Sequence, residues 1–124
     1  MEKIYSSLGL MSGTSMDGID ASIIKSNGED KYQTIFDQYF EYDEEIYREL
    51  IDIRDKVDSS KNLKENLNAI NTLERKITLF HGKVCKQIIE KCTFDIDLVG
   101  FHGQTIFHSV NEKISIQLGD GNLL

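Results

Sequence analysis

The stretch GLMSGTSMDGID, residues 9–20, decides how the chain begins to fold, because it places small polar residues between two apolar segments. Residues 6–11 are short and largely apolar, and after the turn Ile19, Ala21 and Ile23 recur at every second position. Such alternation is typical of a strand with one buried face. The stretch therefore predicts a tight, glycine-bearing turn between two strands.

A third strand and a helix are predicted after this hairpin. Asn27-Gly28 is a strong turn signal, and residues 32–42 beyond it are rich in aromatic side chains that favour a strand. Acidic residues at 43–45 suit a helix start, and apolar residues then recur at helical spacing as far as Val57, so a first helix is expected to end near Asp58. The chain is expected to open with three antiparallel strands followed by a helix.

The clearest helical pattern comes next. Between Asn62 and Ile88 apolar residues recur in steps of three and four, and Asn62 with Glu65 resembles a capping box. Alternation returns at 95–100 and at 114–118, which predicts two more strands. Because these strands must rejoin the sheet of the first three, the chain is predicted to be an α/β domain with a mixed sheet.

Length and charge limit the possible partners. A chain of 124 residues is long enough for one domain with its own core. Its 21 acidic and 14 basic residues give a net charge of −7, so no nucleic acid or anionic membrane partner is expected. No secretory signal or membrane-spanning run is visible, which predicts a cytoplasmic protein. Cys85 and Cys92 lie too far apart on the predicted helix for a disulfide and are expected to be reduced.

The first turn has the composition of a phosphate-binding loop. The turn carries Gly13, Thr14, Ser15 and Gly18, which offer backbone N–H groups and hydroxyls with little side-chain bulk around them, and such groups form concavities for phosphate oxygens. It is not a Walker loop, since no Gly-Lys-Ser/Thr ending and no following helix are present. Asp17 and Asp20 lie beside the turn, and one of them can hold Mg²⁺ through water. The alternative is a plain hairpin whose aspartates cap turn amides.

A different interpretation makes Ser15 a nucleophile, because GTSM also surrounds the nucleophilic serine of subtilisin-like proteases. That chemistry needs a histidine base and an aspartate, which subtilisin-like chains place upstream of the serine. The residues before Ser15 include neither, and the turn leads into a strand instead of a helix. Labelling of Ser15 by a fluorophosphonate probe would support this hydrolase alternative, and no labelling is expected.

A second glycine-bearing segment, VGFHGQTIFH at 99–108, follows a predicted strand. Ligands gather at strand ends in α/β sheets, and the imidazole of His102 and the amide of Gln104 suit sugar hydroxyl and acetamido groups. The alternative is a turn in which His102 bonds a backbone carbonyl. His81 and His108 are interpreted as a helix-face residue and a partly exposed strand residue.

The third segment is SIQLGDGNLL, residues 115–124. Asp120 either caps a helix that begins near Asn122 or points at a ligand, and the cap is favoured from this segment alone. All three glycine-bearing segments follow apolar strands. They are therefore expected to line one edge of the sheet.

GLMSGTSMDGID, VGFHGQT and IQLGD, in this order and separated by a long amphipathic helix, resemble the N-terminal part of anhydro-N-acetylmuramic acid kinase. The resemblance implies a ribonuclease-H-like lobe of the actin-like ATPase superfamily, in which two lobes clamp ATP. Residues 1–124 would be the N-terminal lobe of a two-lobe kinase, truncated before the catalytic segment, with the second lobe absent. Family members can also form homodimers.

The resemblance implies a reaction that uses ATP and Mg²⁺. Water opens the 1,6-anhydro ring of anhydro-N-acetylmuramic acid, and the freed 6-oxygen takes the γ-phosphoryl group, giving N-acetylmuramate 6-phosphate in cell-wall recycling. The family's catalytic aspartate lies downstream of the GD motif, so the base is expected beyond Leu124. No catalytic residue is then expected within this chain, which would be inactive alone. A noncatalytic nucleotide- or muropeptide-binding module is the alternative.

The same resemblance assigns residues to two sites. Those implied to bind ATP phosphates are Gly13, Thr14, Ser15, Met16, Asp17, Gly18, Ile19 and Asp20. Asp17 is the candidate Mg²⁺ ligand, through water. His102, Gln104 and Asp120 are implied to line the substrate cleft between the lobes.

Overall fold

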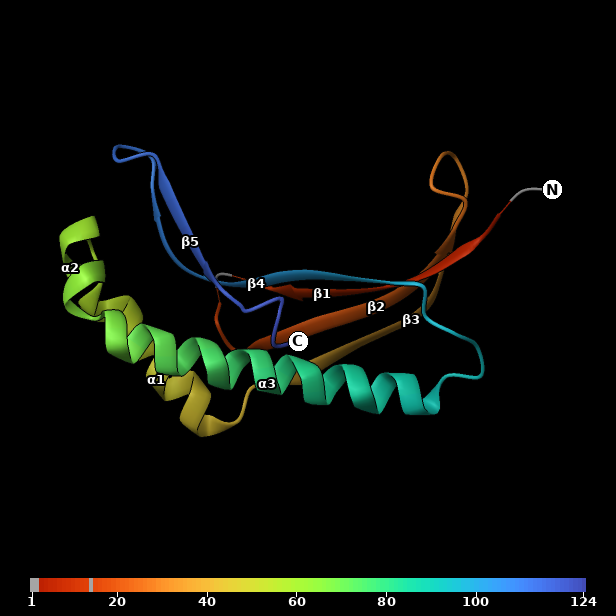
Figure 1. Ribbon diagram of the computed structural model, residues 1–124, viewed down its shortest axis with the longest axis horizontal. Helices are drawn as coiled ribbons and strands as arrows, with labels where there is room; N and C mark the ends of the chain where they lie inside the picture. Colours follow the sequence, from red (N-terminus) through yellow and green to blue (C-terminus); the bar gives the residue numbers. More distant parts are fainter. Residues whose placement is uncertain (1–2, 14) are drawn as a thin grey trace.

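The computed structural model describes residues 3–13 and 15–124 and arranges them as a five-stranded sheet with three helices (Figure 1). Thr14, which the resemblance assigns to the phosphate site, lies outside the described residues. The strands are β1 (Tyr5–Ser12), β2 (Gly18–Ser26), β3 (Tyr32–Glu41), β4 (Leu98–Ser109) and β5 (Ile114–Leu118). The helices are α1 (Glu44–Lys56), α2 (Ser60–Glu65) and α3 (Leu67–Lys91).

The sheet is mixed and has the strand order β3-β2-β1-β4-β5. β1 pairs with β2 and β2 with β3 in antiparallel fashion, β1 pairs with β4 in parallel, and β4 pairs with β5 in antiparallel fashion. A parallel pair needs a long connection, which the helical segment provides. These pairings confirm the predicted α/β class and its three antiparallel strands at the start.

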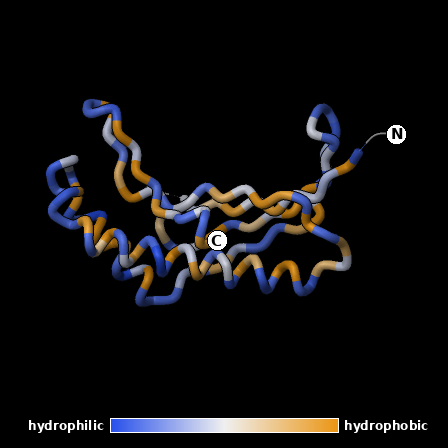
Figure 2. The backbone as a smooth tube through the Cα atoms, in the orientation of Figure 1, coloured by the Kyte–Doolittle hydropathy of each residue, from blue (hydrophilic) through white to orange (hydrophobic). Residues whose placement is uncertain are grey.

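The hydrophobic core lies between one face of the sheet and the helices α1 and α3, which Figure 1 shows on the same side of the sheet. Leu8 of β1, Ile19 of β2, Leu50 of α1 and Ile77 of α3 are all 0% exposed within this core. Complete burial of one such side chain contributes about 1.5–3 kcal/mol. Figure 2 shows hydrophobic positions along the central strands and at intervals along α3, so the two sequence periodicities form the two sides of one core.

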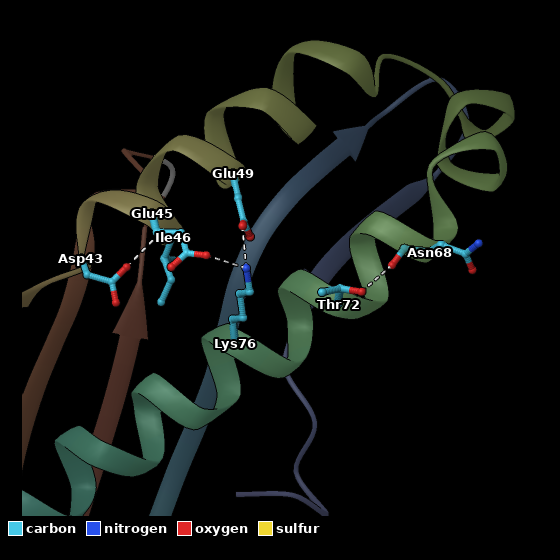
Figure 3. A network of polar contacts seen from close by, with 7 residues as sticks. All are labelled: Asp43, Glu45, Ile46, Glu49, Asn68, Thr72 and Lys76. Carbon is cyan, nitrogen blue, oxygen red and sulfur yellow. Dashed lines mark hydrogen bonds and ion pairs between the residues drawn. The ribbon is translucent and has the colours of Figure 1, made fainter.

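Helix α1 begins where the acidic residues predicted it. The Asp43 side chain is the N-cap and accepts a hydrogen bond from the Ile46 N–H at 2.9 Å (Figure 3). Glu44 and Glu45 fill the first turn, where the helix dipole favours negative charge. A cap of this kind contributes about 1 kcal/mol. The predicted first helix is confirmed.

Lys76 joins α3 to α1 through two carboxylates. Its ammonium group donates to Glu49 at 2.6 Å and to Glu45 at 2.9 Å (Figure 3). The hydrogen bond to Glu49 first, and that to Glu45 second, raise the pKa of Lys76 to about 12. The Lys76 ammonium group therefore stays charged across the physiological pH range, and its ion pairs with Glu45 and Glu49 persist there.

A pH series tests this ion pair. Because the pKa of Lys76 is higher in the folded chain than in the unfolded one (about 10.4), the stabilisation is present below pH ~10. It is lost as the pH rises toward about 12. We expect Lys76→Met to lower the urea midpoint at neutral pH. The difference in urea midpoint between the variant and wild type should become smaller as the pH rises from ~10 toward about 12. Lys76→Arg keeps its charge and is the control. A gap independent of pH would show that the charge is not what stabilises the pair.

The prediction of one uninterrupted helix after position 62 is wrong. The helical segment begins at Ser60 and is divided at Asn66 into α2 and α3. Asn66 has φ −107° and ψ 15°, outside the α-helical range, and its side-chain amide donates to the Asn62 carbonyl at 2.9 Å. The apolar spacing continues through the break, so periodicity alone does not reveal it.

The predicted capping box of Asn62 and Glu65 is also wrong. The N-cap of α2 is Ser59, whose hydroxyl accepts a hydrogen bond from the Asn62 N–H at 3.4 Å. The Asn62 side-chain amide donates to the Lys56 carbonyl at 3.0 Å. Asn62 therefore joins α2 to the end of α1 and does not start a helix.

The prediction of a strand at 95–100 begins the strand too early and ends it too soon. β4 begins at Leu98 and continues to Ser109, so the second glycine-bearing segment lies within a strand and not at its end. Gly103 has φ 80°, and the ladders from β4 to both of its neighbours shift register nearby. Glycine tolerates this conformation, which bends the strand without ending it. The predicted strand at 114–118 is confirmed as β5.

One smaller expectation is borne out. Cys85 and Cys92 are free thiols, and burial raises the pKa of Cys85. Among the described residues, no helix is both long enough and apolar enough to cross a membrane.

Candidate functional site

The turn between β1 and β2 is held by main-chain hydrogen bonds and one buried side chain. The Met16 N–H donates to the Gly13 carbonyl at 3.3 Å, and the Tyr42 N–H donates to the Asp17 carbonyl at 2.9 Å. Met16 has φ 61°, and only 4% of it is exposed. This left-handed backbone costs a non-glycine residue about 1–2 kcal/mol, which burial of the Met16 side chain offsets. Contacts within the chain therefore hold the loop at Gly13, Met16 and Asp17.

Gly18, the first residue of β2, is required by its surroundings. A Cβ atom there would lie 2.3 Å from the Phe40 carbonyl oxygen and 2.6 Å from the Tyr39 hydroxyl oxygen. Both distances are far inside van der Waals contact. The absence of a side chain at Gly18 lets Tyr39 lie across this position and reach Asp17.

Asp17 is an exposed carboxylate that receives two hydrogen bonds. Tyr39 donates to Oδ1 at 2.5 Å and the Ser15 hydroxyl donates to the same oxygen at 2.8 Å. These bonds, that of Tyr39 first, hold the pKa of Asp17 below its usual range. Burial first, and then the bond to Asp17, raise the pKa of Tyr39. At neutral pH Asp17 is therefore a carboxylate and Tyr39 is a neutral donor.

This geometry does not favour the nucleophile interpretation of Ser15. The Ser15 hydroxyl proton is directed to Asp17, and a carboxylate with a lowered pKa is a poor base. Two of the three histidines hydrogen-bond elsewhere: His81 to Ser12 and the Ile77 carbonyl, and His102 to a carbonyl. Among the described residues, Ser15 is therefore a hydrogen-bond donor to Asp17.

The sheet brings the three glycine-bearing segments together. In the ladder between β1 and β4, Ser12 is paired with Gln104, and in the ladder between β4 and β5, Gln104 is paired with Leu118. Close packing accompanies the pairing, because a Cβ at Gly103 would lie 2.7 Å from the Leu118 carbonyl oxygen. A Cβ at Gly119 would lie 2.7 Å from the Phe101 ring. The three segments therefore lie side by side in the sheet, although the second runs within β4 and does not lie at a strand end as the predicted common edge requires.

Gln104 is fully buried, and its side chain is used inside the protein. Its Nε2 donates to the Gly13 carbonyl at 2.8 Å and to the Thr105 carbonyl at 3.1 Å, while its Oε1 accepts from the Tyr42 hydroxyl at 3.1 Å. The second segment therefore supports the first turn from within the core.

His81 and Ser12 belong to the same buried network, which sequence reasoning missed. The Ser12 Oγ lies 3.2 Å from His81 Nε2 and 3.0 Å from the Tyr42 hydroxyl, and His81 Nδ1 bonds the Ile77 carbonyl at 2.8 Å. Burial lowers the pKa of His81, against the opposing effect of the Ile77 bond. The available signal was that His81 continues the buried helical stripe of Ile77 and Cys85.

His102 and Asp120 lie at the surface beside this network. His102 is exposed, and its Nδ1 bonds the Gly103 carbonyl at 2.9 Å. The Asp120 carboxylate accepts from the N–H groups of Asn122 at 3.0 Å and Leu123 at 3.3 Å, as a cap does, although a turn and not a helix follows. His102 thus bonds a backbone carbonyl and Asp120 caps backbone N–H groups, which are the alternatives to ligand binding given for these two residues.

Leu124, beyond which the resemblance places the catalytic base, belongs to the turn that follows β5. Its N–H donates to the Asp120 carbonyl at 3.1 Å. Its side chain lies against α3, since a Cβ at Gly82 would be 3.8 Å from Leu124 Cδ1. These contacts place the end of the third segment beside α3. They do not test the position of the base, which stays a prediction.

A divalent cation at Asp17 would meet one available carboxylate oxygen. Both hydrogen bonds to this carboxylate end on Oδ1, so Oδ2 is the oxygen that would contact a hydrated ion. The described residues include no group of three or more His, Cys, Asp or Glu side chains arranged to hold a metal. The arrangement suits a cation held through water beside a phosphate, and does not suit a closed protein cage.

Comparison with known proteins gives one consistent result. The family described as "Anhydro-N-acetylmuramic acid kinase" matches residues 5–124. A protein of that name from Pelagibacter ubique is 65% identical over 124 residues, which cover 100% of this chain and 33% of the relative. Relatives of the same name from Agrobacterium fabrum and Brucella canis are 35% and 33% identical, again over 100% of this chain and 34% of theirs.

The chain thus spans about a third of the length of these relatives. Its match to the family extends over all three glycine-bearing segments and the helices between them. The chain therefore belongs to the anhydro-N-acetylmuramic acid kinase family.

Proposed function

We propose that residues 1–124 form the N-terminal, phosphate-binding lobe of a two-lobe kinase with the ribonuclease-H-like fold of the actin-like ATPases. The observation that carries this proposal is the internally fixed loop between β1 and β2, in a chain that matches the kinase family throughout. A kinase family implies the use of ATP. The loop from Gly13 to Asp20 is the segment that would receive the ATP phosphates.

Asp17 gives this loop its requirement for a cation. A carboxylate with a lowered pKa beside a phosphate site would repel the ligand unless a divalent cation lay between the two charges. We assign that role to Mg²⁺, held through water near Oδ2 of Asp17. Mg²⁺ supplies neutralisation of the charge that spreads over the phosphate oxygens during transfer. Tyr39 and Ser15 hold the carboxylate in position for this contact.

The reaction of the complete enzyme would join hydrolysis to phosphoryl transfer. A water oxygen bonds to the anomeric carbon of 1,6-anhydro-N-acetylmuramic acid as the bond from that carbon to O6 breaks. O6 then bonds to the γ-phosphorus of ATP, and ADP leaves. The base that activates the water is proposed to lie beyond Leu124, so we propose that the chain alone binds nucleotide without turnover. His102 and Asp120 would face the substrate cleft.

Backbone amide NMR tests the phosphate role. On titration with Mg·ATP we expect saturable shifts of the Gly13, Ser15 and Gly18 amides, because the phosphate oxygens would bond to N–H groups of this loop. The Gly28 amide in the other hairpin turn is the internal control and should not move. Adenosine with Mg²⁺ is the control ligand and should leave the loop unchanged. Asp17→Asn should reduce the dependence of binding on Mg²⁺.

Either of two results would contradict the proposed function. A folded chain whose loop amides do not respond to Mg·ATP lacks the phosphate site. Shifts of equal size with adenosine would place binding at the base or sugar and not at the loop.

A further inference from the structure

A continuous chain of buried polar side chains lies beneath the loop. Ser12, His81 and Gln104 are each 0% exposed, and Tyr42 is 6% exposed. They come from the end of β1, from α3, from β4 and from the residue after β3, respectively. Buried polar groups are costly unless they are satisfied, and a satisfied network favours one arrangement over others.

The direction of the hydrogen bonds follows from the acceptors. A carbonyl can only accept, so His81 Nδ1 carries the proton that is donated to Ile77. The ring is neutral because burial lowers its pKa, and its Nε2 is then an acceptor for the Ser12 hydroxyl. The Phe101 ring, 4.9 Å away between centroids, packs against the imidazole. The orientation of His81 is thus determined from three sides.

Both ends of the loop depend on this network. Ser12 directly precedes Gly13, whose carbonyl accepts from Gln104 at 2.8 Å. Tyr42 donates its own hydroxyl proton to Gln104, and its oxygen lies 3.0 Å from the Ser12 hydroxyl, whose single proton is therefore divided between that oxygen and His81 Nε2. The Tyr42 N–H bonds the Asp17 carbonyl at the other end of the loop. His81 is the member of the network that lies on α3, and it joins the helical layer to Ser12 at the start of the loop.

We propose that His81 is a positioning residue for the phosphate-binding loop, holding the Ser12 hydroxyl from α3 and so fixing the main chain at Gly13. Only the part of this inference that concerns nucleotide binding rests on the proposed function. His81 is fully buried, so its effect on binding passes through Ser12 and the loop.

Two substitutions separate the two nitrogens of the ring. His81→Asn places an amide near the position of Nδ1, which keeps a donor for the Ile77 carbonyl and removes the partner of Ser12. His81→Gln places an amide near the position of Nε2 and keeps a partner for Ser12. Val84→Ala is the matched control, since Val84 is buried on the same helix, 3% exposed, and lies outside the network.

The first measurement needs no nucleotide. We expect His81→Asn to shift the amide resonances of Ser12, Gly13 and Ser15 and to speed their hydrogen exchange, because the Ser12 hydroxyl loses one of its two acceptors and keeps only the Tyr42 oxygen. His81→Gln should restore resonances close to wild type. Val84→Ala should lower stability without moving the loop resonances. In wild type, long-range ¹H–¹⁵N spectra should show a proton on Nδ1 and none on Nε2 of His81.

The second measurement is the affinity for Mg·ATP. Loss of one neutral buried hydrogen bond predicts that His81→Asn binds about three- to tenfold more weakly, with His81→Gln near wild type. The ¹⁵N shift of His81 Nε2 should also move as nucleotide saturates the loop. If wild type fails to bind Mg·ATP, the proposed function is wrong, while the loop resonances of the free chain still test His81.

The inference is overturned if His81→Asn folds, loses stability as Val84→Ala does, and leaves the Gly13 and Ser15 amides unchanged. In that case the histidine is a core residue with no role in the loop. If His81→Asn does not fold, Ser12→Ala decides, since it removes the hydroxyl and leaves the ring in place. Unchanged Gly13 and Ser15 amides in Ser12→Ala overturn the inference equally.

Discussion

Gly18→Ala is expected to destabilise the chain by about 3 kcal/mol, the upper part of the range for overpacked sites. The added methyl group would lie 2.3 Å from the Phe40 carbonyl oxygen, which belongs to the strand ladder and cannot rotate away. The start of β2 must therefore separate from β3. Urea unfolding followed by circular dichroism measures the loss.

The same substitution should disrupt the site. The methyl group would also lie 2.6 Å from the Tyr39 hydroxyl oxygen, so the bond from Tyr39 to Asp17 is expected to break. Because that bond contributes to the raised pKa of Tyr39, one tyrosine should titrate at lower pH in the variant. Gly9→Ala in the neighbouring strand is the control, since its nearest contact is at 3.9 Å. Equal stability of the two variants would refute the close contact at Gly18.

Gly103→Ala is expected to cost a similar amount, about 3 kcal/mol, from two sources. A φ of 80° places an L-residue in the left-handed region, at about 1–2 kcal/mol. The new Cβ would also lie 2.7 Å from the Leu118 carbonyl oxygen, which adds an overpacking cost of about 1–3 kcal/mol. Thermal and urea unfolding measure the sum.

Gly100→Ala is the matched control for Gly103→Ala. Gly100 lies in the same strand, its nearest contacts are at 4.0 Å, and its φ is not in the left-handed region. The free energy of unfolding of Gly100→Ala should stay within about 0.5 kcal/mol of that of wild type. If Gly103→Ala were as stable as Gly100→Ala, the strand would not need a glycine to bend beside β5. Gln104 could then reach Gly13 without this bend.

Local signals in the sequence predicted much of the fold. The short apolar segment at 6–11 and the alternation that begins at Ile19 predicted β1 and β2, and Asn27-Gly28 predicted the turn into β3. The acidic start of α1 was recognised through Asp43, because a cap is formed by residues close together in the chain. Each of these signals involves neighbours along the sequence, so each can be interpreted without knowing the rest of the structure.

The errors arise where the backbone departs from the apolar periodicity. Asn66 interrupts a helix whose apolar spacing continues unbroken, and Gly103 bends a strand that its sequence suggested would end. In both cases the backbone conformation is supported by contacts that the periodicity does not encode. The Asn66 side chain bonds a carbonyl one turn earlier, and Gly103 packs against Leu118.

The sequence by itself determined the three-strand start, the mixed α/β class, and the family through its three glycine-bearing segments. Only the tertiary structure decided that Gln104 points inward to Gly13, 91 positions away, and that His81 meets Ser12, 69 positions away. The physical reason is that a buried hydrogen bond needs a partner at about 3 Å, and for residues so distant in sequence that partner exists only once the sheet and α3 have packed together.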